Sequence, residues 1–240
     1  MATDNPFAIL DDTAQGRDTW RLPTFGPGTE ELRPEHGETV LHVIRDCNLE
    51  ISNQAGSGGT WQTIWRSPAP GTLTATDRRV AYGCRRFEAG SSYGGFGVAG
   101  LAAGLALTAI SKGLAKARSA GHCFGAQARH PSVAAVAFTR LGSASPPVGV
   151  VHFDALGDDR RWRFSFCAVH PAGTTPAIAE AVAAAAIAAR EPWLGDLSAS
   201  ETGELKAIGS PVLRPGPGAT AVIAVPGARR PPVANRRAVR

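Results

Sequence analysis

The segment VGVVHFDALGDDRRWRFSFCAV (148–169) constrains the fold more than any other part of the chain. Apolar residues alternate with polar ones in both of its halves: Val151, Phe153 and Ala155, then Trp162, Phe164 and Phe166. This period of two is typical of half-buried strands, and the Gly-Asp-Asp-Arg sequence between the halves has turn chemistry. The segment therefore predicts an antiparallel hairpin with one face in a core and the other in water.

Similar but shorter patterns predict strands at 38–51, 60–67, 121–129 and 132–140, and a second hairpin at 71–87. In the first of these strands the side expected to be buried is Leu41, Val43, Cys47, Leu49 and Ile51. In the hairpin, Leu73, Ala75, Val80, Tyr82 and Cys84 share the buried side and Asp77 belongs to the turn. These strands are short and separated by turns, which favours antiparallel pairing.

A helix is predicted at 175–193, with Thr174 or Thr175 as its cap, Pro176 in its first turn and Pro192 at its end. Its apolar stripe is Ile178, Val182, Ala185 and Ala189. A helix with one apolar stripe after a set of strands covers a sheet. The fold class expected is α+β, mainly β: a small curled antiparallel sheet or barrel capped by this C-terminal helix.

The order of elements resembles the pleckstrin-homology-like (PH-like) superfamily, in particular its bacterial PH-like and GRAM-like group. The local resemblance is GTLTATDRRV (71–80), because this group often has Gly, an apolar residue and Thr-Asp-x-Arg between its second and third strands. The resemblance implies a domain over 36–193, after a loose lead-in (1–35) and before a Pro/Gly-rich segment with a basic tail (194–240). Such domains bind lipids, peptides or each other.

The segment YGGFGVAGLAAGLALTAISKG (93–113) departs from that family pattern, in which a loop would be ordinary. One interpretation is a nucleotide-binding loop built on Gly95, Gly97 and Gly100, which would make the chain an enzyme. The preceding loop is too long for the tight turn of that motif. No Asp or Glu follows about twenty residues later, where the motif places one.

A second interpretation is an integral or re-entrant membrane protein that uses 89–111 as its hydrophobic segment. These 23 uncharged residues are long enough to cross a bilayer. Few of them are large and apolar, so that insertion is marginal. A crossing would also leave strands of one sheet on opposite sides of the membrane.

The third interpretation is a Gly/Ala-rich helix inserted between strands at about 94–118, which stays with the soluble protein. Its apolar residues and small residues form separate faces, so it has room for a second neighbour besides its own sheet. The candidate contact residues of this helix are Phe96, Val98, Gly100, Leu101, Gly104, Leu105 and Leu107.

The formal net charge of +5 lies at one end of the chain. Five of the 25 basic residues fall in the last twelve positions, which leaves 20 basic residues against 20 acidic ones. A neutral body argues against nucleic-acid binding, whereas an arginine tail suits an anionic membrane surface. The candidate anion or lipid contacts are Arg161, Arg163, Arg229, Arg230, Arg236 and Arg237.

Catalytic and metal-binding patterns are not visible in the sequence. The four cysteines are far apart, the six histidines are scattered, and His42 and His152 are expected on the wet sides of strands. We therefore expect no catalytic residue, no cofactor and no metal. The acidic N-terminus does not have the pattern of a signal peptide, which favours the cytoplasm, with inner-membrane association as the alternative.

Together these patterns predict a non-enzymatic binding module. It would act through protein-protein or peripheral membrane-surface contacts, with an unknown protein partner or a second copy of itself.

Overall fold

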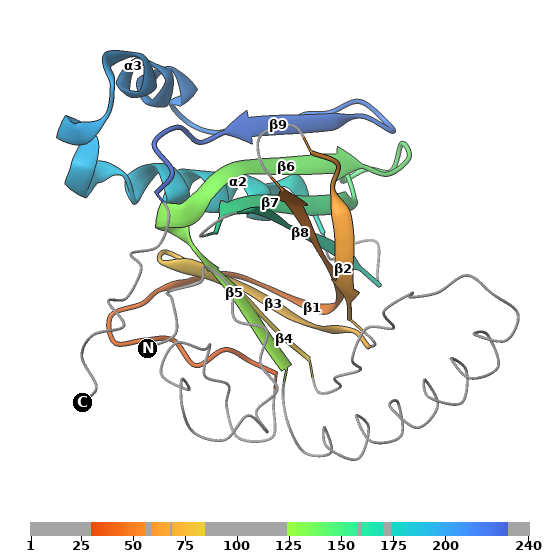
Figure 1. The fold of residues 1–240 in the computed structure, drawn as a ribbon. Coiled ribbons are helices and arrows are strands. Elements are labelled where there is room, and N and C mark those ends of the chain that lie inside the picture. The colour runs from red at the N-terminus through yellow and green to blue at the C-terminus, as the bar shows by residue number, and fades with distance from the viewer. Residues whose placement is uncertain are drawn as a thin grey trace, which may run out of the picture.

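The computed structural model describes residues 30–55, 59–67, 69–84, 124–157, 160–169 and 174–229. These ranges contain nine strands of one antiparallel sheet, with the order β5-β4-β3-β1-β8-β7-β6-β9 and with β2 paired to β1 (Figure 1). The strands are β1 (Val40–Ala55), β2 (Gln62–Arg66), β3 (Gly71–Thr76), β4 (Arg79–Cys84), β5 (Phe124–Arg129), β6 (Val133–Arg140), β7 (Gly149–Leu156), β8 (Arg160–Ala168) and β9 (Thr220–Ala224). The expected mainly β, antiparallel class is confirmed, and the sheet is open.

Both predicted hairpins are present, as β3 with β4 and as β7 with β8, and every other predicted strand is found. The predicted inserted helix, the proposed nucleotide loop and the proposed membrane segment lie outside the described residues. Among the residues that are described, no helix is long and apolar enough to cross a membrane.

The long strand β1 is shared by two halves of the sheet. Its first half pairs with β3, whereas its second half pairs with β8 on one side and β2 on the other. Between these halves Asp46 has a φ of +53°, and the register with β3 shifts between Ile44 and Cys47. This is a β-bulge, which bends a strand and increases its twist. The Asp46 carbonyl accepts a hydrogen bond from the Val169 amide at 2.7 Å, which ties the bend to the end of β8.

The bulge corrects the predicted faces of the first half of β1, including that of His42, which was expected on the wet side but is half-buried on the same face as Ile44. Cys47, Leu49 and Ile51 are buried as predicted, but Leu41 and Val43 are 39% and 43% exposed. One extra residue in a strand moves all residues before it to the opposite face. The first half of β1 therefore turns Ile44, which is 8% exposed, toward the core instead.

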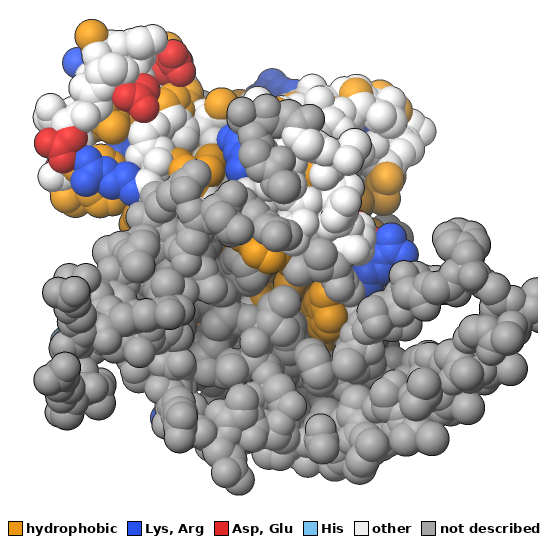
Figure 2. Space-filling model, viewed as in Figure 1, with side chains coloured by type: hydrophobic (Ala, Val, Ile, Leu, Met, Phe, Trp, Pro, Cys, Tyr) orange, Lys and Arg blue, Asp and Glu red, His pale blue; other side chains and the backbone are white. Residues whose placement is uncertain are grey.

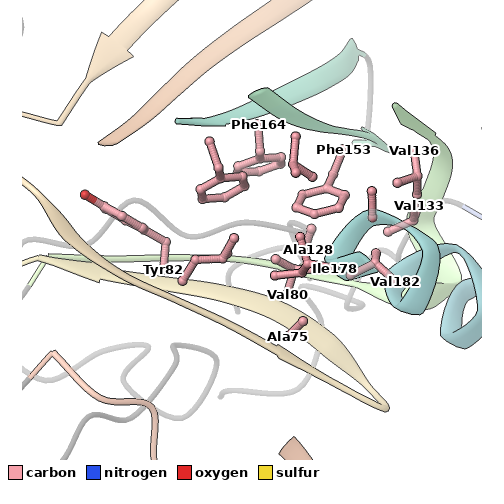
Figure 3. Close-up of a cluster of buried hydrophobic side chains, with 14 of the residues drawn as sticks. Ala75, Val80, Tyr82, Ala128, Val133, Val136, Phe153, Phe164, Ile178 and Val182 are labelled. Atoms are coloured by element: carbon pink, nitrogen blue, oxygen red, sulfur yellow. The ribbon is translucent and has the colours of Figure 1, made fainter. Parts of the chain in front are cut away.

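One hydrophobic core joins both halves of the sheet (Figure 3). Tyr82 on β4 approaches Phe166 on β8 with ring centroids 5.9 Å apart, and Phe153 on β7 lies 5.5 Å from Phe166. The helix α2 (Pro176–Ala188) packs against β6, β7 and β3, with Ile178 and Val182 pointing into the core. Each of these two side chains contributes about 1.5–3 kcal/mol by burial. The helix thus covers the end of the core, as predicted.

The buried stripe of α2 differs in part from the predicted one. Besides Ile178 and Val182 it contains Ala179, Ala183 and Ala186. The predicted Ala185 and Ala189 are half-buried. Because α2 lies against strands from both halves of the sheet, its contact face is wider than a single i, i+4 row.

The chain after α2 has more structure than the Pro/Gly-rich segment and basic tail predicted for 194–240. A 3-10 helix, η3 (Glu191–Asp196), is followed by α3 (Ala199–Ile208) and then β9, which pairs with β6. Ser198 and Glu201 form a reciprocal capping box at the start of α3. Leu205, Leu213 and Val225 from this region are buried in the same core.

A buried ionic cluster fixes the segment before β1 to β4 and β5. The Arg79 guanidinium, 2% exposed, donates from Nε and Nη2 to the two carboxylate oxygens of Glu38 and from Nη1 to Gln127. The Glu38 carboxylate, which is fully buried, also accepts from the Thr76 hydroxyl at 2.7 Å. Glu35 extends the cluster, with an oxygen 3.3 Å from Arg79 Nη1.

A second buried cation fixes the C-terminal part of the chain. Arg190 follows α2, is fully buried and donates to the carbonyl oxygens of His130, Val133 and Pro226. These carbonyls belong to two segments, the start of β6 with the turn before it and the segment that follows β9. His130 is also fully buried, and its Nε2 lies 2.7 Å from the Thr76 carbonyl oxygen.

A candidate binding hollow on the outer face of the sheet

The face of β9, β6, β7 and β8 that points away from the core has a hollow of about 290 Å³, which we call the outer hollow. It is lined by Ala135, Ala137, Thr139, His152, Asp154, Arg163, Thr220 and Val222. Two alanines lie side by side on β6, where longer side chains stand on the neighbouring strands. The hollow exists because these small side chains leave the outer face uncovered at β6, one strand from the β9 edge of the sheet.

His152 lies in a chain of hydroxyl groups that crosses the sheet. Its Nδ1 is 2.9 Å from the Ser165 hydroxyl and its Nε2 is 3.1 Å from the Thr139 hydroxyl, which in turn is 2.8 Å from that of Thr220. Burial, and then the charge of Arg163, lower the pKa of His152 below its usual value. The imidazole is therefore neutral near pH 7 and both of its nitrogens have neutral partners.

Asp154 and Arg163 form the charged part of the outer hollow and compensate each other. They face one another across β7 and β8, and Arg163 donates to the two carboxylate oxygens at 2.7 and 2.8 Å. The Arg163 guanidinium also lies 4.2 Å from the ring centroid of Trp61, a cation–π contact. The hollow thus offers hydroxyls, a neutral imidazole and apolar surface without net charge.

The predicted arginine contacts are not gathered in one place. Arg161 is exposed on the same face of β8 as Arg163. Arg229 lies elsewhere, with Nη2 2.6 Å from Asp196 and its guanidinium 4.9 Å from the Trp193 ring centroid. The other predicted contacts, Arg230, Arg236 and Arg237 and all seven residues of the contact helix, lie outside the described residues.

Other surface features are weaker candidates. Figure 2 shows Asp and Glu side chains gathered at the α3 corner with Lys and Arg side chains beside them. A cavity of about 500 Å³ near the start of α2 combines prolines and aliphatic residues with Arg140, Arg214 and Glu180, and the Glu180 carboxylate accepts from the Leu213 amide. Within the described ranges, no group of His, Cys, Asp and Glu side chains is placed to hold a metal ion.

Sequence reasoning placed His152 on the polar side of its strand, which is confirmed, but it missed the hollow around it. The available signal was the order Ala-x-Ala-x-Thr on the outer side of β6 (Ala135, Ala137, Thr139), since small residues there leave a sheet face shallow. Comparison with protein-family models, with curated proteins and with solved structures finds no match for this chain.

Proposed function

We propose that the chain is a non-enzymatic, cytoplasmic binding module of PH-like architecture that contacts a partner protein through the outer face of β9, β6, β7 and β8. The observation that carries this proposal is the outer hollow, in which polar groups are presented without net charge. The PH-like part is supported by the bent antiparallel sheet, by the helix that follows the β7–β8 hairpin, and by the GTLTATDRRV segment, which forms β3, a turn and the start of β4.

Charge compensation favours a protein partner over an anionic membrane. Arg163 and Arg229 each hold a carboxylate, Asp154 and Asp196 respectively. A phosphate or a lipid headgroup would have to displace that carboxylate or tolerate it as a neighbouring like charge. An uncharged amide or side chain of a protein meets no such cost and finds hydroxyl partners in Thr139 and Thr220.

The two hydroxyl–imidazole pairs at the hollow, Ser165 with His152 Nδ1 and Thr139 with His152 Nε2, favour binding over catalysis, and the hydroxyls of both belong to strands that are paired on each side. Ser165 is within reach of His152, as a nucleophile and base would be. Ser165 lies in the middle of β8, paired with His152 on β7 and Glu50 on β1, so its strand has a hydrogen-bonding neighbour on both sides. Backbone amides in such a ladder are not free to stabilise an oxyanion.

Site-specific photo-crosslinking in cells that naturally produce the chain tests this proposal. A photoreactive phenylalanine at Val222, which is 62% exposed on the outer face, should give a defined protein adduct. The same group at the exposed Lys206 on α3 is the control and should not. Ala137→Leu, which fills the hollow, should remove the Val222 adduct. Equal adducts at both positions, or an adduct that Ala137→Leu leaves unchanged, would refute the proposed surface.

The membrane-surface alternative keeps its support in the arginine-rich sequence at the C-terminus. Flotation with vesicles of phosphatidylcholine and phosphatidylglycerol separates it from the protein-contact proposal. A chain that floats only with the anionic lipid, and loses this when it is ended at Gly227, would favour peripheral membrane binding. Retention after carbonate washing that Leu101→Asp/Leu105→Asp abolishes would favour membrane insertion through 89–111. A rise in melting temperature with ATP or NAD would favour the nucleotide interpretation.

A further inference from the structure

The strand β9 presents an open edge next to the outer hollow. Its partner on one side is β6, with Thr220 opposite Thr139 and Ala224 opposite Ala135. No strand of the described ranges pairs with its other side, so β9 ends the sheet. The flanking amide of Val225 donates to β6, at the Ala134 carbonyl.

Antiparallel pairing fixes which backbone groups of β9 are available. The backbone groups of successive residues point to alternate sides of a strand. Since Val225 bonds to β6, Ala221 and Ile223 do so too, and the N–H and C=O groups of Thr220, Val222 and Ala224 point to the open edge. These same three residues are exposed and carry their side chains on the outer face.

This edge carries few of the features that prevent strand addition. Residues 219–225 contain no charge and no proline, and Val222 is the most exposed large hydrophobic residue of the described chain. Edge strands usually avoid further pairing through charged residues, prolines, bulges or a short length. Of these features, residues 219–225 have only the short length.

The outer hollow lies within reach of a strand added to this edge. Adjacent strands are about 4.8 Å apart, so a residue opposite Ala224 faces the hollow across a single small side chain. Aromatic side chains contact residues at such diagonal or next-strand positions. In strand addition, main-chain hydrogen bonds supply affinity and pockets for alternate side chains supply specificity.

We infer that the open edge of β9 and the outer hollow form one docking site for an extended, uncharged segment of a partner protein. The segment adds as a strand to β9 and places one large aromatic side chain over Ala224 into the hollow. This inference rests on the proposed function and specifies how the partner protein binds. A second copy of the chain fits less well, because symmetric pairing about Val222 places Thr220 of the copy opposite Ala224, and threonine is too small to fill the hollow.

A selection from a random nonapeptide display library on the full chain, followed by anisotropy titration of the selected peptides, tests this inference. We expect peptides of alternating character with one aromatic residue and no net charge. Val222→Pro should weaken their binding about tenfold or more, since it removes an edge hydrogen bond and obstructs pairing. The Val222 N–H points away from β6, and edge strands tolerate proline in that position. Val222→Thr, which keeps the N–H, is the matched comparison and should retain tighter peptide binding than Val222→Pro.

The outcomes separate this inference from the proposed function. Binding that Val222→Pro leaves unchanged but Ala137→Leu abolishes would overturn strand addition and keep the outer face as the contact surface. Binding that neither change affects would overturn both. Failure to enrich any peptide would overturn the inference, as would a dimer in light scattering that Val222→Pro dissociates. An unchanged melting temperature for Val222→Pro shows that its binding defect does not come from unfolding.

Discussion

Replacing Glu38 by Gln should destabilise the fold, because it leaves the buried Arg79 guanidinium without its nearest counter-charge. Burial raises the pKa of the Glu38 carboxyl. The hydrogen bonds from Arg79, the Glu35 amide and the Thr76 hydroxyl, together with the Arg79 charge, outweigh this effect and lower the pKa from 4.5 to about 2. At 1.36 kcal/mol for each pH unit, this difference corresponds to roughly 3 kcal/mol of folding stability. Breaking a buried ion pair by removing one partner costs a similar 3–5 kcal/mol.

The sign of the pH dependence follows from the lowered pKa. The contribution of Glu38 is complete above the unfolded pKa of 4.5 and disappears as the pH falls through the folded value of about 2. In urea titrations, Glu38→Gln should therefore reduce the free energy of unfolding by about 3 kcal/mol at pH 7 and by roughly half of that at pH 3. Glu31→Gln, which breaks the exposed pair with Arg45, is the control and should cost less than about 1 kcal/mol. A loss for Glu38→Gln that is the same at both pH values, or no larger than the control, would refute this reasoning.

Three further changes test other buried or capping groups. Burial lowers the pKa of His130 from 6.5 to about 4, so the free energy of unfolding of the unmodified chain should decrease as the pH falls from 6.5 to 4. In urea titrations, His130→Gln should make the free energy of unfolding less dependent on pH over this range. Arg190→Met removes the hydrogen bonds to the His130, Val133 and Pro226 carbonyls, of which that of His130 keeps the Val133 amide as a donor, and should cost about 3 kcal/mol or more, measured as a lower melting temperature, whereas a change below about 1 kcal/mol would contradict the role given to Arg190. Ser198→Ala removes the capping box of α3 and should cost about 1 kcal/mol, with faster amide exchange confined to α3.

The hairpins were predictable because their signals are local. In β3 and β4, alternation and the Thr-Asp turn lie within fourteen residues, and Leu73, Ala75, Val80, Tyr82 and Cys84 are all buried as predicted. The same holds for β7 and β8, except that the predicted Trp162 is only half-buried. Alternation determines which side of a strand is apolar, and in these hairpins no bulge interrupts it.

The face of the first half of β1 was not predictable from alternation, because a single residue changes it. Asp46 adopts a positive φ, which Asp does more readily than most residues. Nothing in the period of two marks where such a bulge falls. By contrast, the start of α3 had a signal that the prediction missed: Ser198 followed three residues later by Glu201 is a capping-box pattern. The helix itself has little apolar periodicity, with Leu205 its only buried residue, so the cap was its main sequence mark.

The small residues of β6 were a sequence signal for a shallow sheet face, but the residues around the outer hollow could not be predicted, because they depend on which strands are neighbours. Ala137 lies next to His152 on one side and Val222 on the other, and the last of these is 85 residues away in sequence. The pairing of strands also connects the bend in β1 at Asp46 to the proposed site. The bend lets β1 pair with β3 in its first half and with β8 in its second, so β8 and β7 continue the sheet beyond β1. The core then occupies the inside of this bend, and the polar residues of β7 and β8 necessarily face outward. Burial of Phe153 and Phe164 thus fixes the positions of their neighbours in sequence, His152, Asp154 and Arg163, because adjacent residues of a strand point to opposite faces. The packing that stabilises the fold therefore also positions the hollow proposed to bind a partner.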